Sequence, residues 1–385
     1  MPAVRRFALL LGGLAAIACG RPPLVRLAPA PAESALDSTG LATTVFLIGD
    51  AGSSQPGDRV LAELTRQGKA AKRGSAIVFL GDNVYPAGIP PDTADAYPEA
   101  RRRLLDQAVV AESTGLRVIF VAGNHDWDRQ RKTGGTTIRR QATLLRHYAD
   151  STRARVEFQP EAGCPGPAIT PIGTRVRLVA IDTPWWLQER LQPGTSHCGG
   201  ATEALVLDSL RRTFAVDESR ITIAVGHQPI ESNGEHGGYH PWIQYLLPLV
   251  PTPMARWAWV PIGWIYPLGR RLFHHPQDLT SRLNGSLRSA LEGTFSVRAP
   301  LIYAAGHEHS LEVIRRGPGR YYLISGAGTE EHETAVGRGD STAFSSSRPG
   351  FMRVDVFAGN RVRLGVTVID AERRPREIFQ AWLKE

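Results

Sequence analysis

The chain has 385 residues, of which 42% are hydrophobic and 21% are charged, and it carries a formal net charge of +8 with a pI near 9.7. This apolar content can bury a large core, which excludes a disordered chain and allows one large domain or two. The positive charge comes from scattered arginines rather than from a run of like charges. We therefore expect no nucleic-acid partner, whereas anionic small substrates or anionic lipid surfaces suit the charge balance.

The first 19 residues have the layout of an export signal. Arg5 and Arg6 precede twelve uncharged, mostly apolar residues, and Cys19 follows small residues. The apolar run is too short to span a bilayer as a helix. The stretch AIAC at 16–19 resembles the lipobox of bacterial lipoprotein precursors, although alanine stands where leucine is preferred. We expect either a membrane lipoprotein anchored through Cys19 and facing the periplasm, or a secreted protein.

Residues 20–40 are rich in proline and alanine without periodicity, which is typical of a tether. Residues 41–385 are then expected to form the folded domain. Export also bears on the cysteines, because Cys164 and Cys198 remain as an even pair once Cys19 belongs to the leader or the lipid. In an oxidising compartment such a pair predicts a disulfide.

Three apolar runs near the start of the domain share one pattern at their ends. Each ends in glycine followed by side chains that can bind metal: TTVFLI before Gly49-Asp50, SAIVFL before Gly81-Asp82, and RVIFVA before Gly123-Asn124-His125-Asp126. Segments 57–72 and 95–114 between the runs are long enough for crossover helices. Alternating strands and helices predict a largely parallel inner sheet, in which sites form at the carboxyl ends of the strands.

Two later runs repeat the pattern. ITIAV precedes Gly226-His227, and APLIYAA precedes Gly306-His307-Glu308-His309. Glycine at each exit allows a sharp turn or the close approach of a ligand. One such turn is commonplace, but five carrying this set of side chains predict a common site at one edge of the sheet.

The chemistry of these side chains indicates transition metals. Two carboxylates, an amide oxygen and three imidazoles form a mixed oxygen and nitrogen set, unlike the all-oxygen set that Mg or Ca prefers. Six or seven protein ligands are too many for one catalytic ion. They suit two ions roughly 3.5–4 Å apart, the arrangement that stabilises attacking and leaving oxygens in phosphoryl transfer.

The ordered motifs resemble a known superfamily. They are Asp-x-Gly at 50–52, GDNVY at 81–85, GNHD at 123–126, GHQP at 226–229 and GHEH at 306–309. In this order they are similar to the five blocks of the calcineurin-like metallophosphoesterases, over roughly residues 43–330. The resemblance implies an α/β (α+β) fold with four layers, a β-sandwich flanked by helices, with the site at the carboxyl ends of the inner strands.

Within that superfamily the chain most resembles the small, tartrate-resistant purple acid phosphatases, because Tyr85 completes its block and Glu235-His236-Gly237 follows the fourth block. The resemblance implies seven metal ligands. They are Asp50, Tyr85 and His309 for Fe(III), Asn124, His227 and His307 for Fe(II), Zn or Mn, and Asp82 as the bridge. Three further side chains would line the phosphate pocket and assist protonation of the leaving group, namely His125, Glu235 and His236.

The activity that this resemblance implies is hydrolysis of phosphomonoesters by metal-bound hydroxide. Phosphorylated small molecules or phosphoproteins would be the substrates. Three alternatives stay open at single residues. Tyr85 could pack under the site instead of binding metal, and Glu235 with His236 could be a solvated pair in the glycine-rich loop ESNGEHGGYH. Asp126 is expected to support the ligands, while Glu312 is expected to lie on the surface.

The stretch 239–277 is an insertion relative to the small family members. It holds four of the eight tryptophans and many prolines, so it cannot form a regular spanning helix. It is either a lid over the site, a surface that enters a membrane interface, or an interaction loop. The tail from 350 onward alternates as a hairpin with a Gly-Asn turn and is expected to close the second sheet.

Two other functions compete with the phosphomonoesterase. One is a phosphodiesterase or nucleotidase of the same superfamily that uses two Mn or Zn ions with Tyr85 unligated. The other is a non-catalytic surface lipoprotein that binds partners or membrane through its aromatic insertion. None of the five blocks is broken, which favours an enzyme, because a scaffold without catalysis is free to lose ligands.

Overall fold

The computed structural model describes residues 25–26, 39–161, 163–188, 198, 202–216, 219–240, 277–331 and 334–385. The predicted export signal with Cys19, most of the predicted tether, and positions 241–276 of the predicted insertion lie outside these residues. None of the described helices combines the length and the apolar character needed to span a membrane.

One sheet has seven strands in the order β15-β14-β13-β2-β3-β4-β5. The strands are β2 (Leu41–Ile48), β3 (Ala76–Phe79), β4 (Arg117–Phe120), β5 (Val156–Phe158), β13 (Gly350–Phe357), β14 (Val362–Ile369) and β15 (Pro375–Lys384). Strands β2 to β5 are parallel. The helices that connect them are α2 (Arg59–Ala70), α3 (Tyr97–Thr114) and α4 (Gly134–Thr152). The two crossover helices expected within 57–72 and 95–114 are therefore present.

The other sheet has eight strands in the order β1-β12-β10-β11-β9-β8-β7-β6. These are β1 (Val25–Arg26), β6 (Ala168–Ile172), β7 (Val176–Ala180), β8 (Ile221–Val225), β9 (Ile302–Ala305), β10 (Leu311–Arg315), β11 (Tyr321–Ser325) and β12 (Thr342–Ser346). Strands β7, β8, β9 and β11 run parallel to one another. Helices α5 (Glu203–Ala215) and α7 (Arg282–Phe295) belong to this half of the molecule.

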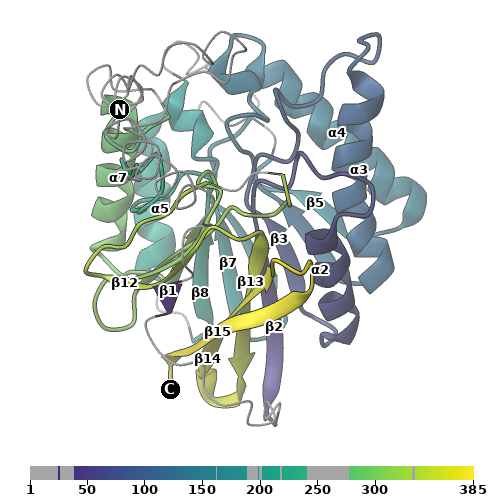
Figure 1. Ribbon diagram of the computed structural model, residues 1–385. Coiled ribbons are helices and arrows are strands. Elements are labelled where there is room, and N and C mark those ends of the chain that lie inside the picture. The colour runs from purple at the N-terminus through teal and green to yellow at the C-terminus, as the bar shows by residue number, and fades with distance from the viewer. Residues whose placement is uncertain are drawn as a thin grey trace, which may run out of the picture.

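The two sheets pack face to face, and helices cover the outer face of each sheet (Figure 1). Val78 of β3 and Leu323 of β11 share the core between the sheets. On the outer side, Ile77 of β3 packs in one cluster with Leu104 of α3, and α5 and α7 cover the other sheet in the same way. Strands that are buried on both faces read as continuous apolar runs. The predicted four-layer sandwich is confirmed.

The ends of the helices follow from local sequence. The side chains of Asp58, Thr202 and Ser281 accept hydrogen bonds from backbone N–H groups in the first turns of α2, α5 and α7. Such N-caps satisfy donors that have no partner within the helix. Helix α3 ends at Gly115, whose φ of 70° lies in the left-handed region that glycine adopts without strain.

The C-terminal hairpin is present but belongs to a different sheet from the one expected. Strands β13 and β14 pair antiparallel across a turn in which Gly359 and Asn360 have φ of 77° and 61°. Strand β13 also pairs with β2, so the hairpin extends the sheet that holds the first three motifs. The covalent link expected from the cysteines is also present, since Cys164 and Cys198 form a disulfide with 5.6 Å between their Cα atoms.

Candidate metal centre

The five glycine-ended runs are strands of two different sheets. Asp50, Asp82 and Asn124 follow β2, β3 and β4 of the seven-stranded sheet, whereas His227 and His307 follow β8 and β9 of the eight-stranded sheet. The expectation of a single sheet edge is therefore wrong, because the motifs are divided between the sheets. The carboxyl ends of both sets of strands open toward the same side of the sandwich, so the side chains still meet.

Three of these residues have backbone conformations that side chains rarely adopt. The φ angles of Asp50, Asp82 and His307 are 59°, 53° and 71°, in the left-handed region. Each non-glycine residue held there costs on the order of 1 kcal/mol, and such strain clusters at functional sites. The surrounding packing must therefore hold these three turns in place.

Glycine is required at two of the exits because the neighbouring strands approach closely. A Cβ atom on Gly123 would lie 2.2 Å from Oδ1 of Asp82, and one on Gly81 would lie 2.6 Å from Nδ1 of His227. Neither space admits a methyl group. The glycines thus let three motif loops from β3, β4 and β8 contact one another directly.

Tyr85 is the centre of a first cluster of ligand atoms. Its Oη atom lies 2.9 Å from Oδ1 of Asp50, 3.1 Å from Oδ2 of Asp82 and 3.0 Å from Nε2 of His309. Nε2 of His309 is also 3.5 Å from Oδ1 of Asp50. The tyrosine hydroxyl therefore points into the site instead of packing beneath it.

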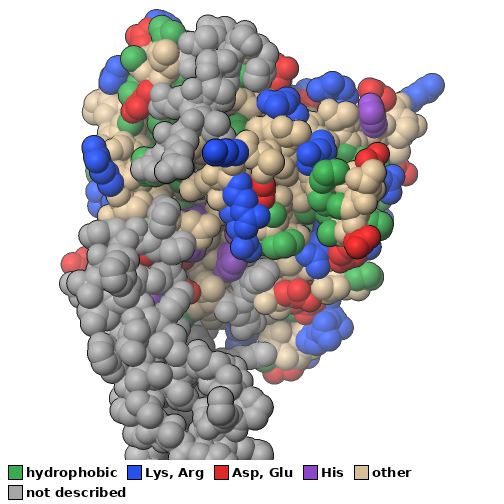
Figure 2. All heavy atoms as spheres, turned by 90° about the horizontal axis from the view of Figure 1, so that it is seen from above, with side chains coloured by type: hydrophobic (Ala, Val, Ile, Leu, Met, Phe, Trp, Pro, Cys, Tyr) green, Lys and Arg blue, Asp and Glu red, His purple; other side chains and the backbone are tan. Residues whose placement is uncertain are grey.

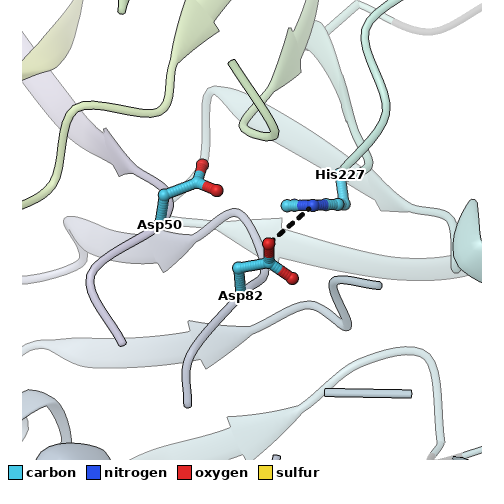
Figure 3. Close-up of side chains that lie close together, drawn as sticks. All are labelled: Asp50, Asp82 and His227. Atoms are coloured by element: carbon cyan, nitrogen blue, oxygen red, sulfur yellow. Dashed lines mark ion pairs between the residues drawn. The ribbon is translucent and has the colours of Figure 1, made fainter. Parts of the chain in front are cut away.

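Asn124 is the centre of a second cluster. Its Oδ1 atom lies 2.9 Å from Nε2 of His227 and 3.0 Å from Nδ1 of His307. Nε2 of His227 lies 3.4 Å from Oδ2 of Asp82, the ion pair drawn in Figure 3. Asp82 consequently faces both clusters, which is the position that a bridging ligand would occupy.

The outer nitrogens of the two histidines test whether this second cluster fits a metal ion. Nδ1 of His227 lies 2.8 Å from the carbonyl oxygen of Leu80, and Nε2 of His307 lies 3.0 Å from that of Gln277. A carbonyl only accepts, so the outer nitrogen of each ring carries a proton. Burial lowers the pKa of His307, so this neutral ring turns a lone pair toward Oδ1 of Asn124. For His227 burial opposes the charged form, but Asp82 raises the pKa to about 9, so without a metal ion Nε2 also carries a proton and faces Asn124 and Asp82 as a donor. A cation between the facing lone pairs of His307 and Asn124 would remove their conflict, and outward donation to a carbonyl is usual for metal-binding histidines.

Charge within the centre also fits cation binding. The ligand atoms of Asp50, Asp82 and His227, all buried, lie within 4.8 Å of one another. Burial opposes ionisation of Asp82, but His227 and His125 lower its pKa well below the usual value. Burial and the charges of Asp50 and Asp82 raise the pKa of Tyr85, so a phenolate there needs a strong cation beside it.

Asp126 has the supporting role expected from the sequence. It is buried, and its carboxylate accepts hydrogen bonds from the backbone N–H groups of Asn83, Val84 and Gly123 and from the side-chain amide of Asn83. These bonds tie the second motif to the third. A side chain outside both clusters thus helps to hold the loops of Asp82 and Asn124 together.

Both of the histidines predicted for the phosphate pocket, His125 and His236, border the clusters. Nδ1 of His125 lies 2.6 Å from the carbonyl oxygen of Pro86, so it carries the proton and leaves Nε2 facing Oδ2 of Asp82 at 3.9 Å. Nδ1 of His236 lies 3.2 Å from Oδ1 of Asp278, and its ring stacks on His307 with 4.3 Å between centroids.

Glu235 precedes His236 and is half-buried, but it belongs to neither ligand cluster. The loop that carries both residues is anchored by acids that sequence reasoning missed. Glu312, expected on the surface, is fully buried and accepts hydrogen bonds from Ser232 Oγ and from the backbone N–H and side-chain amide of Asn233. Glu308 accepts from the N–H of Gly237. In the sequence, the sign that could have identified Glu312 as buried was its position as a charged residue within the apolar strand β10.

A sixth strand end was also missed. Strand β7 is followed by Asp182 and Thr183, and Oγ1 of Thr183 accepts hydrogen bonds at 3.0 Å from the backbone N–H of His227 and of Gln228. Burial raises the pKa of Asp182 to about 7 despite hydrogen bonds from Trp127 and the backbone of Trp185. The run RVRLVAID carries no glycine before its carboxylate, so the pattern did not reveal it.

Comparisons with known proteins point to the same superfamily that the sequence motifs resemble. The calcineurin-like phosphoesterase family model matches residues 43–250. Two similar solved structures are GAP50, the anchor in the inner membrane complex of Plasmodium (17% identity, 89% of each chain covered, TM-score 0.55), and purple acid phosphatase PPD1 from yellow lupin, Lupinus luteus, seeds (14% identity, 88% of this chain and 53% of that chain, TM-score 0.51). At these identities the likeness shows the fold alone. No curated protein sequence matches significantly.

Proposed function

This chain belongs to the calcineurin-like phosphoesterase family, and from that premise we propose that it is an exported, lipid-anchored phosphatase that hydrolyses phosphomonoesters at a dinuclear metal centre. The observation that carries the proposal is the position of Asp82. It faces a cluster around Tyr85 on one side and a cluster around Asn124 on the other. Such paired sets of oxygen and nitrogen ligands suit two transition-metal ions.

The two clusters would hold different ions. Asp50, Tyr85 and His309 would bind Fe(III), because the phenol is a hard oxygen ligand whose ionisation needs a highly charged cation. The neutral amide and imidazoles of the second cluster suit Fe(II), Zn or Mn, and they are Asn124, His227 and His307. When bound, such ions supply Lewis acidity that activates water and neutralises charge on the phosphoryl group.

The chain's own residues would position the substrate and move the proton. His125 donates its Nδ1–H to the carbonyl oxygen of Pro86, which fixes the ring with Nε2 toward Asp82. An imidazolium at His125 would pass its Nε2 proton to the leaving-group oxygen. His236, oriented by Asp278 and stacked on His307, lies beside the second cluster and would bind a phosphate oxygen.

The experiment that tests this function is aerobic purification followed by a visible spectrum and an activity panel. We expect a charge-transfer band from tyrosinate to Fe(III), its loss in Tyr85→Phe, and hydrolysis of phosphomonoesters in preference to diesters at acid pH. A colourless protein that is fully active with Mn or Zn on diesters or nucleotides would instead identify the phosphodiesterase or nucleotidase alternative.

A second candidate is a surface protein without catalysis that binds partners or membrane. GAP50, whose fold is similar, is described as the anchor in the inner membrane complex of Plasmodium. Purified protein that binds no metal and hydrolyses none of the phosphate esters in the panel would support that candidate. The enzyme is favoured because both ligand clusters are complete in the structure, including the outward hydrogen bonds of His227 and His307.

Export and anchoring rest on the first 19 residues, with their arginine pair, apolar run and Cys19. The proposal predicts that the protein sediments with membranes after expression in a bacterium and is released by Cys19→Ser. A protein that stays soluble and unprocessed in the cytoplasm would contradict both export and lipidation.

A further inference from the structure

The turn that follows the third motif has an unusual backbone. Asp128, Arg129 and Gln130 have φ of 51°, 51° and 64°, so three consecutive residues other than glycine lie in the left-handed region. Each costs on the order of 1 kcal/mol, and such strain persists only where the surroundings enforce it. The backbone N–H of Arg129 donates to the carbonyl of Asn124 at 2.8 Å, which fastens the turn to the motif that supplies a proposed metal ligand.

This turn places the guanidinium of Arg129 beside His125. Nε of Arg129 donates at 2.9 Å to the carbonyl oxygen of Pro86, the same atom that accepts from Nδ1 of His125 at 2.6 Å. The two nitrogens are 3.5 Å apart. Because Nε2 on the other edge of that imidazole lies 3.9 Å from Oδ2 of Asp82, only one ring separates the guanidinium from the metal centre.

The positive charge of Arg129 is not neutralised within the described part of the chain. The nearest acid in sequence, Asp128, accepts instead from the hydroxyl of Thr133 and pairs with Arg131 at 3.6 Å. Among the described residues, no carboxylate pairs with Arg129, and its two terminal nitrogens donate to no protein group. The side chain is exposed, as are Arg131 and Lys132. On the face that Figure 2 shows, Lys and Arg side chains lie directly beside histidines near the middle.

We propose that Arg129 forms a subsite for a second anionic group on the substrate, specifically a phosphate in the leaving group. This rests on the proposed function, in which His125 protonates the leaving oxygen. The leaving group must then lie against His125, and Arg129 borders the same ring. The paired terminal N–H groups of a guanidinium match two phosphate oxygens. The substrate class is therefore a diphosphate, either inorganic or esterified.

The reaction is a balanced hydrolysis. Water adds its oxygen to the terminal phosphorus, the bond from that phosphorus to the bridging oxygen breaks, and the bridging oxygen receives a proton through His125. Inorganic diphosphate gives two phosphates, and an esterified diphosphate gives phosphate and a monoester. Arg129 would hold the departing phosphate and would not touch the attacked phosphorus.

The test compares inorganic diphosphate with 4-nitrophenyl phosphate, whose leaving group carries no phosphate, in steady-state kinetics of the metal-loaded protein. The chosen variant is Arg129→Asn, because asparagine tolerates the left-handed conformation better than most residues. We expect kcat/KM for diphosphate to fall about 10- to 100-fold, mainly through KM, and that for 4-nitrophenyl phosphate to change less than about threefold. Arg129→Lys should recover part of the loss.

Two controls separate this subsite from general charge and from the proposed function. Arg139→Gln removes another exposed arginine, ten residues away in α4, and should leave the hydrolysis of both substrates unaffected. Calorimetry with methylenediphosphonate, which is not hydrolysed at its bridge, measures binding without turnover, and Arg129→Asn should weaken it about 10-fold relative to phosphate.

The possible outcomes are distinct. Equal losses for both substrates, or unchanged methylenediphosphonate binding, would overturn the subsite while leaving the phosphatase intact. Absence of all hydrolysis would refute the proposed function, and the calorimetry would still decide whether Arg129 binds the second phosphate.

Discussion

Nε2 of His227 lies 3.4 Å from Oδ2 of Asp82, although the two residues follow strands of different sheets. His227 comes after β8 of the eight-stranded sheet, and Asp82 after β3 of the seven-stranded sheet. The candidate centre therefore exists only when the two sheets are packed together. Metal binding and the packing of the sandwich should consequently depend on each other.

The first prediction concerns Asp82, the side chain common to both clusters. Asp82→Asn keeps the size of the residue but removes its charge, so we expect loss of both metal occupancy and turnover, the latter by at least about 100-fold. Metal content by mass spectrometry and phosphatase rate would be measured on the same preparation. Full activity with full metal content would argue strongly against the assigned site.

The second prediction uses the contact between Gly123 and Asp82. A Cβ at Gly123 would lie 2.2 Å from Oδ1 of Asp82, so Gly123→Ala must displace the bridging carboxylate or the loop. We expect a loss of about 2 kcal/mol or more in unfolding free energy together with weaker metal binding. Urea unfolding with and without added metal measures both effects.

The matched control is Gly293→Ala in α7, where an added Cβ meets nothing within 4 Å. Alanine in a helix interior should stabilise the protein by about 0.5–1 kcal/mol and leave metal binding unchanged. Similar behaviour of the two alanine variants would show that the crowding at Gly123 is unimportant.

The third prediction concerns Glu312, which anchors the loop of Glu235 and His236. Glu312→Ala leaves the partly buried donors of Ser232 and Asn233 without their buried acceptor, and we expect a loss of about 1–3 kcal/mol in unfolding free energy. Phosphatase activity should also fall because His236 loses its fixed position. Glu292→Ala, which removes a 3.9 Å pair with Arg316 on the surface, should change stability by less than about 0.5 kcal/mol.

The fourth prediction concerns the pH dependence of stability at Asp182. Its pKa of about 7 in the folded protein exceeds the value of about 3.9 for an unfolded chain. The folded state therefore binds an extra proton between these values, and the stability this contributes is present below about pH 4 and lost as pH rises toward 7. Asparagine does not titrate, so the Asp182→Asn variant does not lose stability at this position as the pH rises.

We thus expect the unfolding free energy of Asp182→Asn to rise relative to the parent between pH 4 and 7, by an amount on the order of 1.4 kcal/mol for each unit of pKa shift. Urea titrations of metal-free protein at several pH values give the difference. A constant difference across this range would show that Asp182 is ionised throughout.

Much of the architecture could be predicted because local patterns carry it. Continuous apolar runs marked the strands, and the intervening segments were long enough for α2 and α3. What the patterns could not show was the division of the motifs between two sheets, since strand pairing joins residues far apart in the chain. The hairpin β13–β14 was found from its turn, but its partner β2 lies more than 300 positions earlier.

At the site, residue types and order predicted six candidate ligands, and the family resemblance added Tyr85. The structure brings all seven side chains into two neighbouring clusters. The supporting residues were harder to predict. Glu312 was expected on the surface because a glutamate in a strand gives no sign of the hydrogen-bond donors that surround it in the folded chain. The sequence did not distinguish Arg129 from the many other arginines, because its position beside His125 depends on the left-handed turn.

The most direct test of the central claim is a crystal structure of protein loaded with iron and zinc, with anomalous scattering recorded at both absorption edges. The account predicts two ions, one held with Tyr85 and one with Asn124, with Asp82 binding both. A single ion, or ions bound away from these clusters under saturating metal, would contradict it.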